Sequence, residues 1–195
     1  MISIQLLYSR QVPRTINCDP DMLGKGAASI TIDDILCILG QIQAKKPIGN
    51  AVLDAQIALD KSARRMLESA VIGSLIANDC DSCIAKALAN VALFEVCESP
   101  VCPRCKGTGL FAQANKGMVE CTKCNGVGNF IPSDRLLHKM VIERLPEERR
   151  FCRNTFKKRW YDKYMDIVDK LHAEAGEASL YAKQLLREIE YQDVV

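Results

Sequence analysis

Apolar residues recur at helical spacing over residues 31–98. Thr31 and Asp34 fit a helix start, and the stripe that follows consists of Ile35, Leu36, Leu39 and Ile42. Pro47 and Gly49 are expected to end this helix. Further helical stretches begin at Asn50, with breaks near residues 60–62 and 78–81. The last stretch, residues 83–97, has Ala87, Leu88, Val91, Leu93 and Phe94 at helical spacing. The pattern predicts a small all-α bundle.

A second group of helices is predicted after residue 131. Ser133 fits an N-cap, and Pro146 is expected to stop the helix that it starts. The apolar face of that helix is Leu136, Leu137, Met140, Val141 and Leu145. After a short charged loop, another helix begins near Arg153, with a buried stripe of Phe156, Trp160, Tyr164, Ile167 and Leu171. Residues 178–191 are predicted to form one more amphipathic helix, with an acidic outer face.

These patterns divide the chain into five segments. Residues 1–30 are broken by Pro13, Pro20, Gly24 and Gly26 and are expected to form a flexible or extended arm. A helical body follows over 31–100, then a four-cysteine segment over 101–130, a helix-turn-helix over 131–172 and a C-terminal helix over 173–195. The predicted fold is mainly α: a helical bundle with an inserted four-cysteine knuckle and a helix-turn-helix.

Composition and charge bear on the cellular setting. The chain has 26 basic and 24 acidic residues, but residues 102–131 alone carry a net +3 and residues 132–171 a net +4. Ten cysteines would suggest disulfides in a secreted protein. The N-terminus has no signal-peptide pattern, and no stretch approaches the roughly 18 apolar residues of a membrane span. We therefore expect a cytoplasmic protein without a membrane partner, in which paired cysteines bind metal more often than they crosslink.

Two Cys-x-x-Cys pairs, each followed by x-Gly-x-Gly, define a cysteine knuckle over residues 102–128. Cys102, Cys105, Cys121 and Cys124 suit one tetrahedral zinc ion, with Zn–S bonds of about 2.3 Å. The glycines at 107, 109, 126 and 128 allow the positive φ that such turns need, and they leave backbone N–H groups for the sulfurs. Four thiolates leave no open position for water, so a structural zinc and no enzymatic activity are expected.

The remaining cysteines and histidines favour ordinary packing. Cys80 and Cys83 form a third Cys-x-x-Cys, but no strand precedes it, so buried cysteines are favoured over an accessory metal or redox site. Isolated cysteines, interpreted as small hydrophobes, are Cys18, Cys37, Cys97 and Cys152. His138 and His172 are interpreted as helix-surface groups.

Residues 149–159, the basic segment, hold six basic side chains and no acidic one. A helix here buries its aromatic residues and turns Asn154, Thr155, Lys158, Arg159 and Asp162 outward. Two helices joined by a short Pro-containing loop describe a helix-turn-helix, whose second helix enters the major groove of double-stranded DNA. Arg149, Arg150 and Arg153 suit phosphates, and the reading helix adds Asn154, Thr155, Lys157, Lys158 and Arg159. A solvated basic surface helix is the alternative.

The order of these features resembles antitermination protein Q of lambda-type bacteriophages. The likeness is most specific over residues 102–171, with the doubled cysteine unit, the Pro-Ser helix start and the helix-turn-helix. It is looser over residues 32–97. The resemblance implies a factor that binds DNA at a phage late promoter and engages RNA polymerase paused with its sigma factor. Such a factor then travels with the polymerase and narrows its RNA exit channel, so that terminator hairpins cannot form.

The resemblance also assigns roles to residues. It implies that Cys102, Cys105, Cys121 and Cys124 hold the zinc, that Arg153 to Arg159 read DNA, and that the helical body contacts host polymerase. Two alternatives stay open. One is a zinc-containing, sequence-specific regulator without antitermination activity. The other is a chaperone or redox module, because the same cysteine unit occurs in the cysteine-rich domain of DnaJ chaperones, which carries four such units and two zinc ions.

Overall fold

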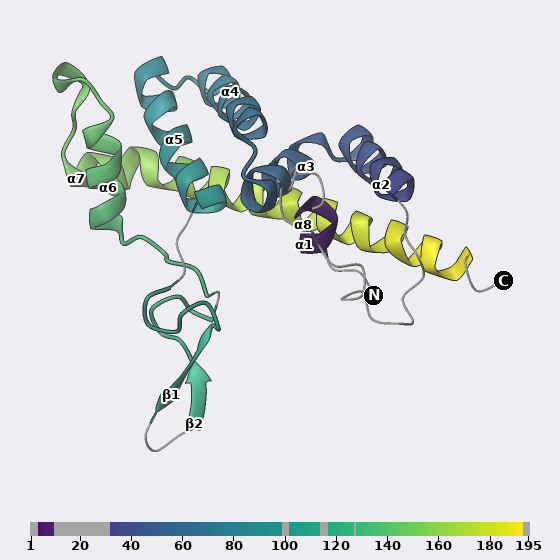
Figure 1. Ribbon diagram of the computed structural model, residues 1–195. Helices are drawn as coiled ribbons and strands as arrows, with labels where there is room; N and C mark the ends of the chain where they lie inside the picture. Colours follow the sequence, from purple (N-terminus) through teal and green to yellow (C-terminus); the bar gives the residue numbers. More distant parts are fainter. Residues whose placement is uncertain (1–3, 10–31, 99–101, 114–116, 127, 193–195) are drawn as a thin grey trace. The chain divides into compact units, whose positions relative to one another are not determined.

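The computed structural model describes residues 4–9, 32–98, 102–113, 117–126 and 128–192, and most of them lie in helices (Figure 1). The strands within these ranges are two short ones, and the rest of the non-helical residues form turns and connections. The expectation of a mainly α fold is therefore confirmed. The chain divides into two compact units: the first draws on residues 1–67 and 169–195, and the second is residues 68–168. The five segments expected from the sequence remain an interpretation of it.

The first unit contains α1 (Ile4–Ser9), α2 (Ile32–Lys45), α3 (Pro47–Leu53) and a π-helical turn, η2 (Asp54–Ala58). One face of α2 is buried and consists of Ile35, Ile38, Leu39 and Ile42. These residues follow the i, i+3, i+4, i+7 pattern of a single helix face. Leu36, predicted on that face, falls outside the pattern and is 59% exposed.

The helix end predicted at Pro47 is confirmed, but the next helix begins at Pro47 itself and not at Asn50. The helix α2 ends at Lys45, and Pro47 occupies the first turn of α3, where its missing N–H leaves no hydrogen bond unmade. Gly49, also expected at a helix end, lies inside α3 and is buried. A Cβ there would stand 2.1 Å from the carbonyl oxygen of Glu174, so this glycine lets α3 approach α8 closely.

For residues 4–9 the prediction of an irregular arm is wrong. They form α1, in which Leu7 and Tyr8 are fully buried. The Tyr8 hydroxyl donates a hydrogen bond to Oδ1 of Asn50 in α3, at 2.9 Å. This short stretch can fold because the proline and glycine breakers of the arm begin only at Pro13. Residues 10–31 lie outside the described residues.

Aspartate caps mark the two predicted breaks in the helical body. Asp60 precedes α4 (Lys61–Ala77), and its Oδ1 accepts the N–H of Ser62 at 2.7 Å. Asp81 precedes α5 (Ser82–Glu98), and its Oδ1 accepts the N–H of Cys83 at 3.0 Å. Both contacts satisfy an N–H of the first helical turn, which has no partner inside the helix. The breaks near 60–62 and 78–81 are confirmed.

In the second unit, α6 (Asp134–Glu143) begins directly after Ser133, as predicted. The Ser133 side chain, however, makes no capping hydrogen bond. The helix buries Leu137 and Val141, and Leu145 beyond its end is buried too. A 3-10 turn, η3 (Glu147–Arg149), follows in the connection to the next helix.

The chain is helical without interruption from residue 153 to residue 192. It passes through α7 (Arg153–Thr155), a π-helical turn η4 (Phe156–Trp160) and α8 (Tyr161–Gln192). The prediction of a separate C-terminal helix is therefore wrong, because α8 continues through residues 172–177. Gly176 interrupts the pattern there, yet a glycine inside a helix costs only about 1 kcal/mol relative to alanine. The flanking Ala175 and Ala178 are buried and hold this part of α8 in place.

The buried stripe predicted around these turns is largely confirmed. Phe156, Trp160, Tyr164 and Leu171 are buried, whereas Ile167 is only partly buried and the neighbouring Val168 is buried instead. The hydroxyl of Tyr164 donates a 2.5 Å hydrogen bond to Oε2 of Glu95, which links α8 to α5 within the second unit.

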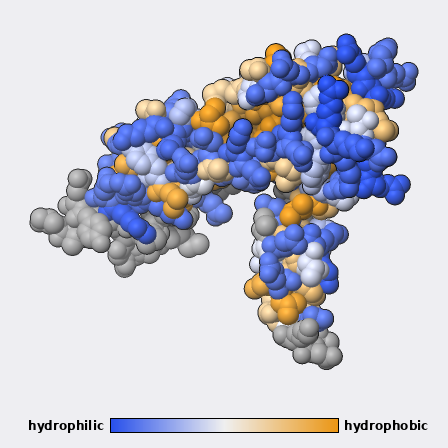
Figure 2. All heavy atoms as spheres, turned by 180° about the vertical axis from the view of Figure 1, so that it is seen from behind, coloured by the Kyte–Doolittle hydropathy of each residue, from blue (hydrophilic) through white to orange (hydrophobic). Residues whose placement is uncertain are grey.

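An antiparallel hairpin joins the two halves of the cysteine knuckle. Its strands are β1 (Leu110–Gln113) and β2 (Gly117–Glu120), with Leu110 opposite Glu120 and Gln113 opposite Gly117. No strand is predicted here from the sequence, because four mostly exposed residues show no alternation of apolar and polar positions. Leu110 and Met118 are 44% and 63% exposed, and Figure 2 shows apolar residues among polar ones along the hairpin.

Across the described parts of the chain, no helix is both long enough and apolar enough to cross a membrane.

Candidate functional site

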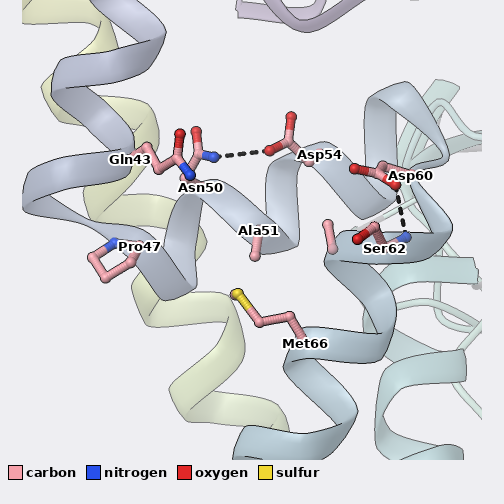
Figure 3. Close-up of a pocket in the computed structure, with 9 residues that line it drawn as sticks. Gln43, Pro47, Asn50, Ala51, Asp54, Asp60, Ser62 and Met66 are labelled. Carbon is pink, nitrogen blue, oxygen red and sulfur yellow. Dashed lines mark hydrogen bonds between the residues drawn. The ribbon is translucent and has the colours of Figure 1, made fainter.

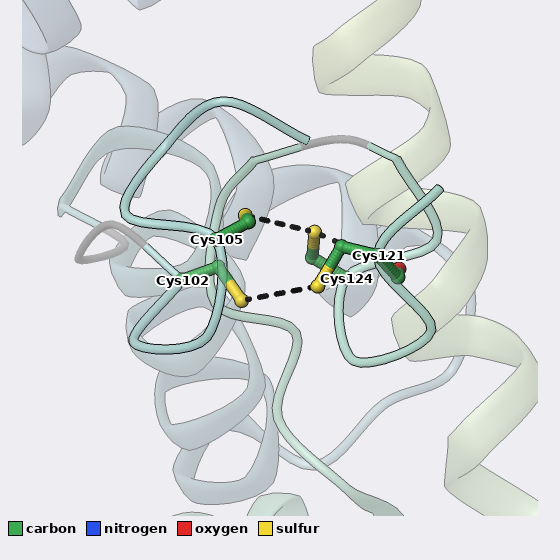
Figure 4. Close-up of side chains that lie close together, drawn as sticks. All are labelled: Cys102, Cys105, Cys121 and Cys124. Atoms are coloured by element: carbon green, nitrogen blue, oxygen red, sulfur yellow. Dashed lines mark hydrogen bonds between the residues drawn. The ribbon is translucent and has the colours of Figure 1, made fainter. Parts of the chain in front are cut away.

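The structure brings the four predicted cysteines of the knuckle together. All four side chains are buried, and their sulfur atoms lie within 4.8 Å of one another (Figure 4). Sγ of Cys102 is 3.9 Å from that of Cys121, and Sγ of Cys105 is 3.6 Å from that of Cys124. Sulfurs bound tetrahedrally to one zinc ion stand about 3.8 Å apart, given Zn–S bonds of about 2.3 Å. The cluster could therefore hold one metal ion.

The glycines of the knuckle adopt the predicted backbone conformation. The φ angles are 91° at Gly107, 71° at Gly109, 78° at Gly126 and 86° at Gly128. A second requirement was not predicted. A Cβ on Gly109 would lie 2.1 Å from the carbonyl oxygen of Gly126, and one on Gly128 would lie 2.4 Å from that of Gly107. The two turns thus pack directly against each other at their glycines.

Backbone hydrogen bonds tie the two halves of the knuckle to each other. The N–H of Cys102 donates to the carbonyl oxygen of Gly128, and the N–H of Cys121 donates to that of Gly109, both at 2.8 Å. The N–H of Gly128 donates to Sγ of Cys124 at 3.3 Å, as predicted for an amide facing a thiolate. The two turns are therefore held in register around the cysteines.

Local hydrogen bonding favours the deprotonated state at Cys102, whereas burial raises the pKa of the Cys124 thiol to about 11. The backbone N–H of Cys105 lowers the pKa of the Cys102 thiol to about 7. The thiolate, not the thiol, is the metal-binding form of cysteine. Metal binding at this cluster would displace protons from the other thiols.

The basic segment presents its predicted polar residues to solvent. Asn154, Thr155, Lys158 and Arg159 are exposed, whereas Phe156 and Trp160 of the same helical stretch are buried. The guanidinium carbon of Arg159 lies 5.0 Å from the centroid of the Trp160 ring. The structure therefore bears out the outward orientation of these residues. Contact with DNA remains a prediction.

Four of the six basic side chains in this segment pair with carboxylates. Arg149 Nη1 lies 3.2 Å from Oδ2 of Asp81, and Arg150 Nη1 lies 3.7 Å from Oε1 of Glu147. Lys157 Nζ and Arg153 Nη2 both form ion pairs with Oδ2 of Asp134, at 2.5 and 3.9 Å. Within the described residues, Lys158 and Arg159 have no such ion pair. The acidic partners lie outside the segment or at its edge and were not predicted.

The connection between α6 and α7 differs from the short loop that was expected. It spans residues 144–152 and includes η3, whereas a helix-turn-helix joins its helices through about 3–4 residues. His138 of α6 contacts this connection. Its Nε2 donates to the carbonyl oxygen of Phe151 at 2.9 Å, and its ring centroid lies 5.9 Å from that of Phe156. His138 is therefore partly buried in this connection, unlike the freely exposed helix-surface group that was expected, while His172 is exposed as expected.

The isolated cysteines are less uniform than predicted. Cys97 is buried, as suits a small hydrophobe, but Cys37 and Cys152 are exposed. Cys18 lies outside the described residues. In the third Cys-x-x-Cys, Cys80 is buried and Cys83 is exposed, and burial raises the pKa of the Cys80 thiol. The described residues bring no third ligand to this pair.

A pocket of about 200 Å³ lies in the first unit, beside the turn η2 (Figure 3). Oδ2 of Asp54 accepts a hydrogen bond from Nδ2 of Asn50 at 2.8 Å, but among the described residues its buried Oδ1 has no hydrogen-bond partner. Burial, and to a lesser degree the nearby Asp60, raises the pKa of Asp54 to about 6. The lining consists of Gln43, Pro47, Asn50, Ala51, Asp54, Asp60, Ser62, Ala63 and Met66.

Fold and site together define a mainly helical protein with a buried four-cysteine cluster that could hold a metal ion. The chain belongs to the family described as conserved hypothetical protein CHP02642, whose model matches residues 1–101 and 98–191. The two matched stretches meet at the start of the cysteine knuckle and together cover nearly the whole chain. No curated protein matches it. The likeness to antitermination protein Q therefore rests on the order of motifs alone.

Proposed function

We propose that this protein is a zinc-braced, DNA-binding regulator of transcription. The observation that carries the proposal is the outer face of the helix that begins at Arg153. It exposes Asn154, Lys158 and Arg159, while Phe156 and Trp160 of the same helical stretch are buried in the second unit. Lysine and arginine suit guanine, and asparagine suits adenine, in the major groove. A helix fixed by aromatic packing can hold such side chains against base edges.

In the finer form of the proposal, the protein is a phage late-gene antitermination factor in the bacterial cytoplasm. It binds DNA near the late promoter, loads onto host polymerase paused with its sigma factor, and suppresses pausing and termination. Support for this form comes from the resemblance to antitermination protein Q, whose features occur in the same order over residues 102–171.

The knuckle serves as a structural brace in this proposal. Its four thiolates occupy all four coordination positions of a tetrahedral zinc ion. No position is left for a substrate, so the knuckle performs no catalysis. Its charge also changes on metal binding. Residues 102–131 carry a net +3 with neutral thiols, and a zinc ion with four thiolates contributes −2. The loaded knuckle is therefore close to neutral, and attraction for DNA must come mainly from the segment after it.

Transcription in vitro tests the finer form. The template carries a phage late promoter with its promoter-proximal element and a terminator downstream. Read-through that requires both the protein and the element supports an antiterminator loaded from DNA. Binding to the element with unchanged termination would instead support a DNA-binding regulator without antitermination activity.

A chaperone-like module is a second candidate, favoured by one observation. The hairpin of the knuckle exposes Leu110 and Met118, which could contact an unfolded client. Suppression of aggregation of a denatured client, lost in a Leu110→Ser, Met118→Ser double variant, would support this candidate. The burial of all four knuckle cysteines argues against a cycling redox role.

A further inference from the structure

We infer that Asp134 occupies a phosphate-binding site on the basic segment and competes there with the DNA backbone. The inference rests on the proposed DNA binding and adds a regulatory element to it. A single carboxylate oxygen, Oδ2 of Asp134, receives the cations of both Lys157 and Arg153, at 2.5 and 3.9 Å. Two cations converging on one anionic oxygen form the arrangement that a phosphate oxygen also prefers.

The site is accessible to a larger anion. The side chains of Arg153 and Lys157 are 49% and 47% exposed, and that of Asp134 is 35% exposed. Exposed ion pairs of this kind are weak and exchange readily with other partners. A DNA phosphate can therefore displace Asp134, but each displacement offsets part of the electrostatic gain. Among the six cations of the basic segment, Lys158 and Arg159 pair with no carboxylate within the described residues.

Asp134 also occupies the first turn of α6, where a negative charge favours the helix. That role alone would make Asp134 a stabilising residue without effect on DNA binding. The two roles predict different results, because only competition with phosphate changes the salt dependence of DNA binding. Each phosphate contact made by a cation contributes about −0.9 to the slope of log K against log salt.

The test is binding of the zinc-loaded full chain to a labelled 20-base-pair duplex of arbitrary sequence, measured by fluorescence anisotropy at several salt concentrations. Phosphate contacts do not depend on sequence, so no cognate site is needed. Asp134→Asn is expected to tighten binding about two- to tenfold at low salt and to steepen the slope by about one. Asp134→Ser, which keeps a small polar residue at the helix start, is expected to do the same.

Glu143→Gln is the matched control. It removes the same charge from the other end of α6, where Glu143 pairs with Lys139 at 3.8 Å. A double-mutant cycle adds the decisive comparison: in an Arg153→Ala, Lys157→Ala background, removal of Asp134 should no longer tighten binding.

Several results would overturn the inference while leaving DNA binding in place. These are unchanged affinity in both Asp134 variants, an equal gain in Glu143→Gln, or a gain that persists without Arg153 and Lys157. Absence of duplex binding by the wild-type chain and every variant would instead remove the proposed function and, with it, this inference.

Discussion

Gly109 and Gly117 have the same backbone angle, φ of 71°, in different surroundings. A Cβ on Gly109 would collide with the carbonyl oxygen of Gly126, whereas no atom of the described residues lies within 4 Å of a Cβ on Gly117. Comparing the two glycines therefore separates two energetic costs of adding a side chain. One is the strain of a left-handed backbone, about 1–2 kcal/mol, and the other is the clash between the two knuckle turns.

We predict that Gly109→Ala lowers the zinc affinity of the knuckle at least tenfold relative to Gly117→Ala. Both variants bear the backbone strain, but only the first pushes the two cysteine turns apart. Competition with a chromophoric chelator measures the affinity. Equal affinities in the two variants would mean that the close packing of the turns does not hold the metal site.

The residues of the knuckle were predictable because their chemistry is local. The spacing of the cysteines and the glycines after them specify the turn without reference to the rest of the chain. Asp81 and Asp134 could not be found in this way. Each looks like an ordinary acidic residue at a helix start, and only the fold brings Arg149 to the first and Lys157 to the second.

Asp54 makes stability depend on pH with a definite sign. Its pKa is raised to about 6 in the folded protein, from an ordinary value of 3.8. Between about pH 4 and pH 6 the folded state therefore binds more protons than the unfolded state does. The free energy of unfolding must fall as pH rises through this window, so the ionised carboxylate weakens the first unit at neutral pH.

We predict that Asp54→Asn raises the free energy of unfolding by about 1 kcal/mol at pH 7.5. The full shift corresponds to about 3 kcal/mol, which the partial exposure of the carboxyl reduces. At pH 4 the gain should vanish, because the native carboxyl is then protonated. Denaturant unfolding at both pH values measures the effect, with the exposed Asp169→Asn as control. Destabilisation at pH 7.5, or an equal gain at pH 4, would contradict the assignment.

At the scale of elements, α3 and α8 illustrate what helical spacing can and cannot predict. The spacing finds most helices, because one buried face imposes its period on the sequence. Helical spacing misplaces a helix end where the residue there is compatible with two different structures. Pro47 can stop one helix or start another, and Gly176 can break a helix or be tolerated in one. Packing decides in both places: Gly49 lies against α8, and Ala175 and Ala178 are buried around Gly176.

Glycine-to-alanine changes in these two helices should change the free energy of unfolding in opposite directions. Gly49→Ala is predicted to lower the free energy of unfolding by about 1–3 kcal/mol or more, since its Cβ would meet the Glu174 backbone and Ala178. Gly176→Ala, with no atom of the described residues within 4 Å of its Cβ, should raise it by about 0.4–1 kcal/mol. Thermal or denaturant unfolding followed by circular dichroism measures both. A stabilising Gly49→Ala would show that α3 does not approach α8 so closely.

At the scale of the whole molecule, the four cysteines that could hold a metal ion all lie outside the described helices. They lie in turns beside the hairpin. Removal of the metal should therefore unfold residues 102–128, whose fold depends on the cluster, while the helical signal stays nearly constant.

We predict that chelation, or Cys121→Ser, opens the hairpin to proteases without loss of far-UV helical signal. Cys83→Ser, which changes an exposed cysteine outside the cluster, should leave the digestion pattern unchanged. Full protection of the knuckle in the absence of metal would contradict its role as a metal-stabilised brace.

DNA binding by the helix face that begins at Arg153 is the central claim. Its most direct test compares two double variants of the zinc-loaded chain on a 20-base-pair duplex at low salt. Lys158→Ala, Arg159→Ala removes the two cations of the basic segment that pair with no carboxylate in the described residues. Lys170→Ala, Lys183→Ala removes two exposed cations farther along α8. We expect the first pair to weaken binding at least tenfold and to flatten the salt slope by about two, with little change from the second. Equal affinities for the two variants, or no binding by the wild-type chain, would contradict the claim.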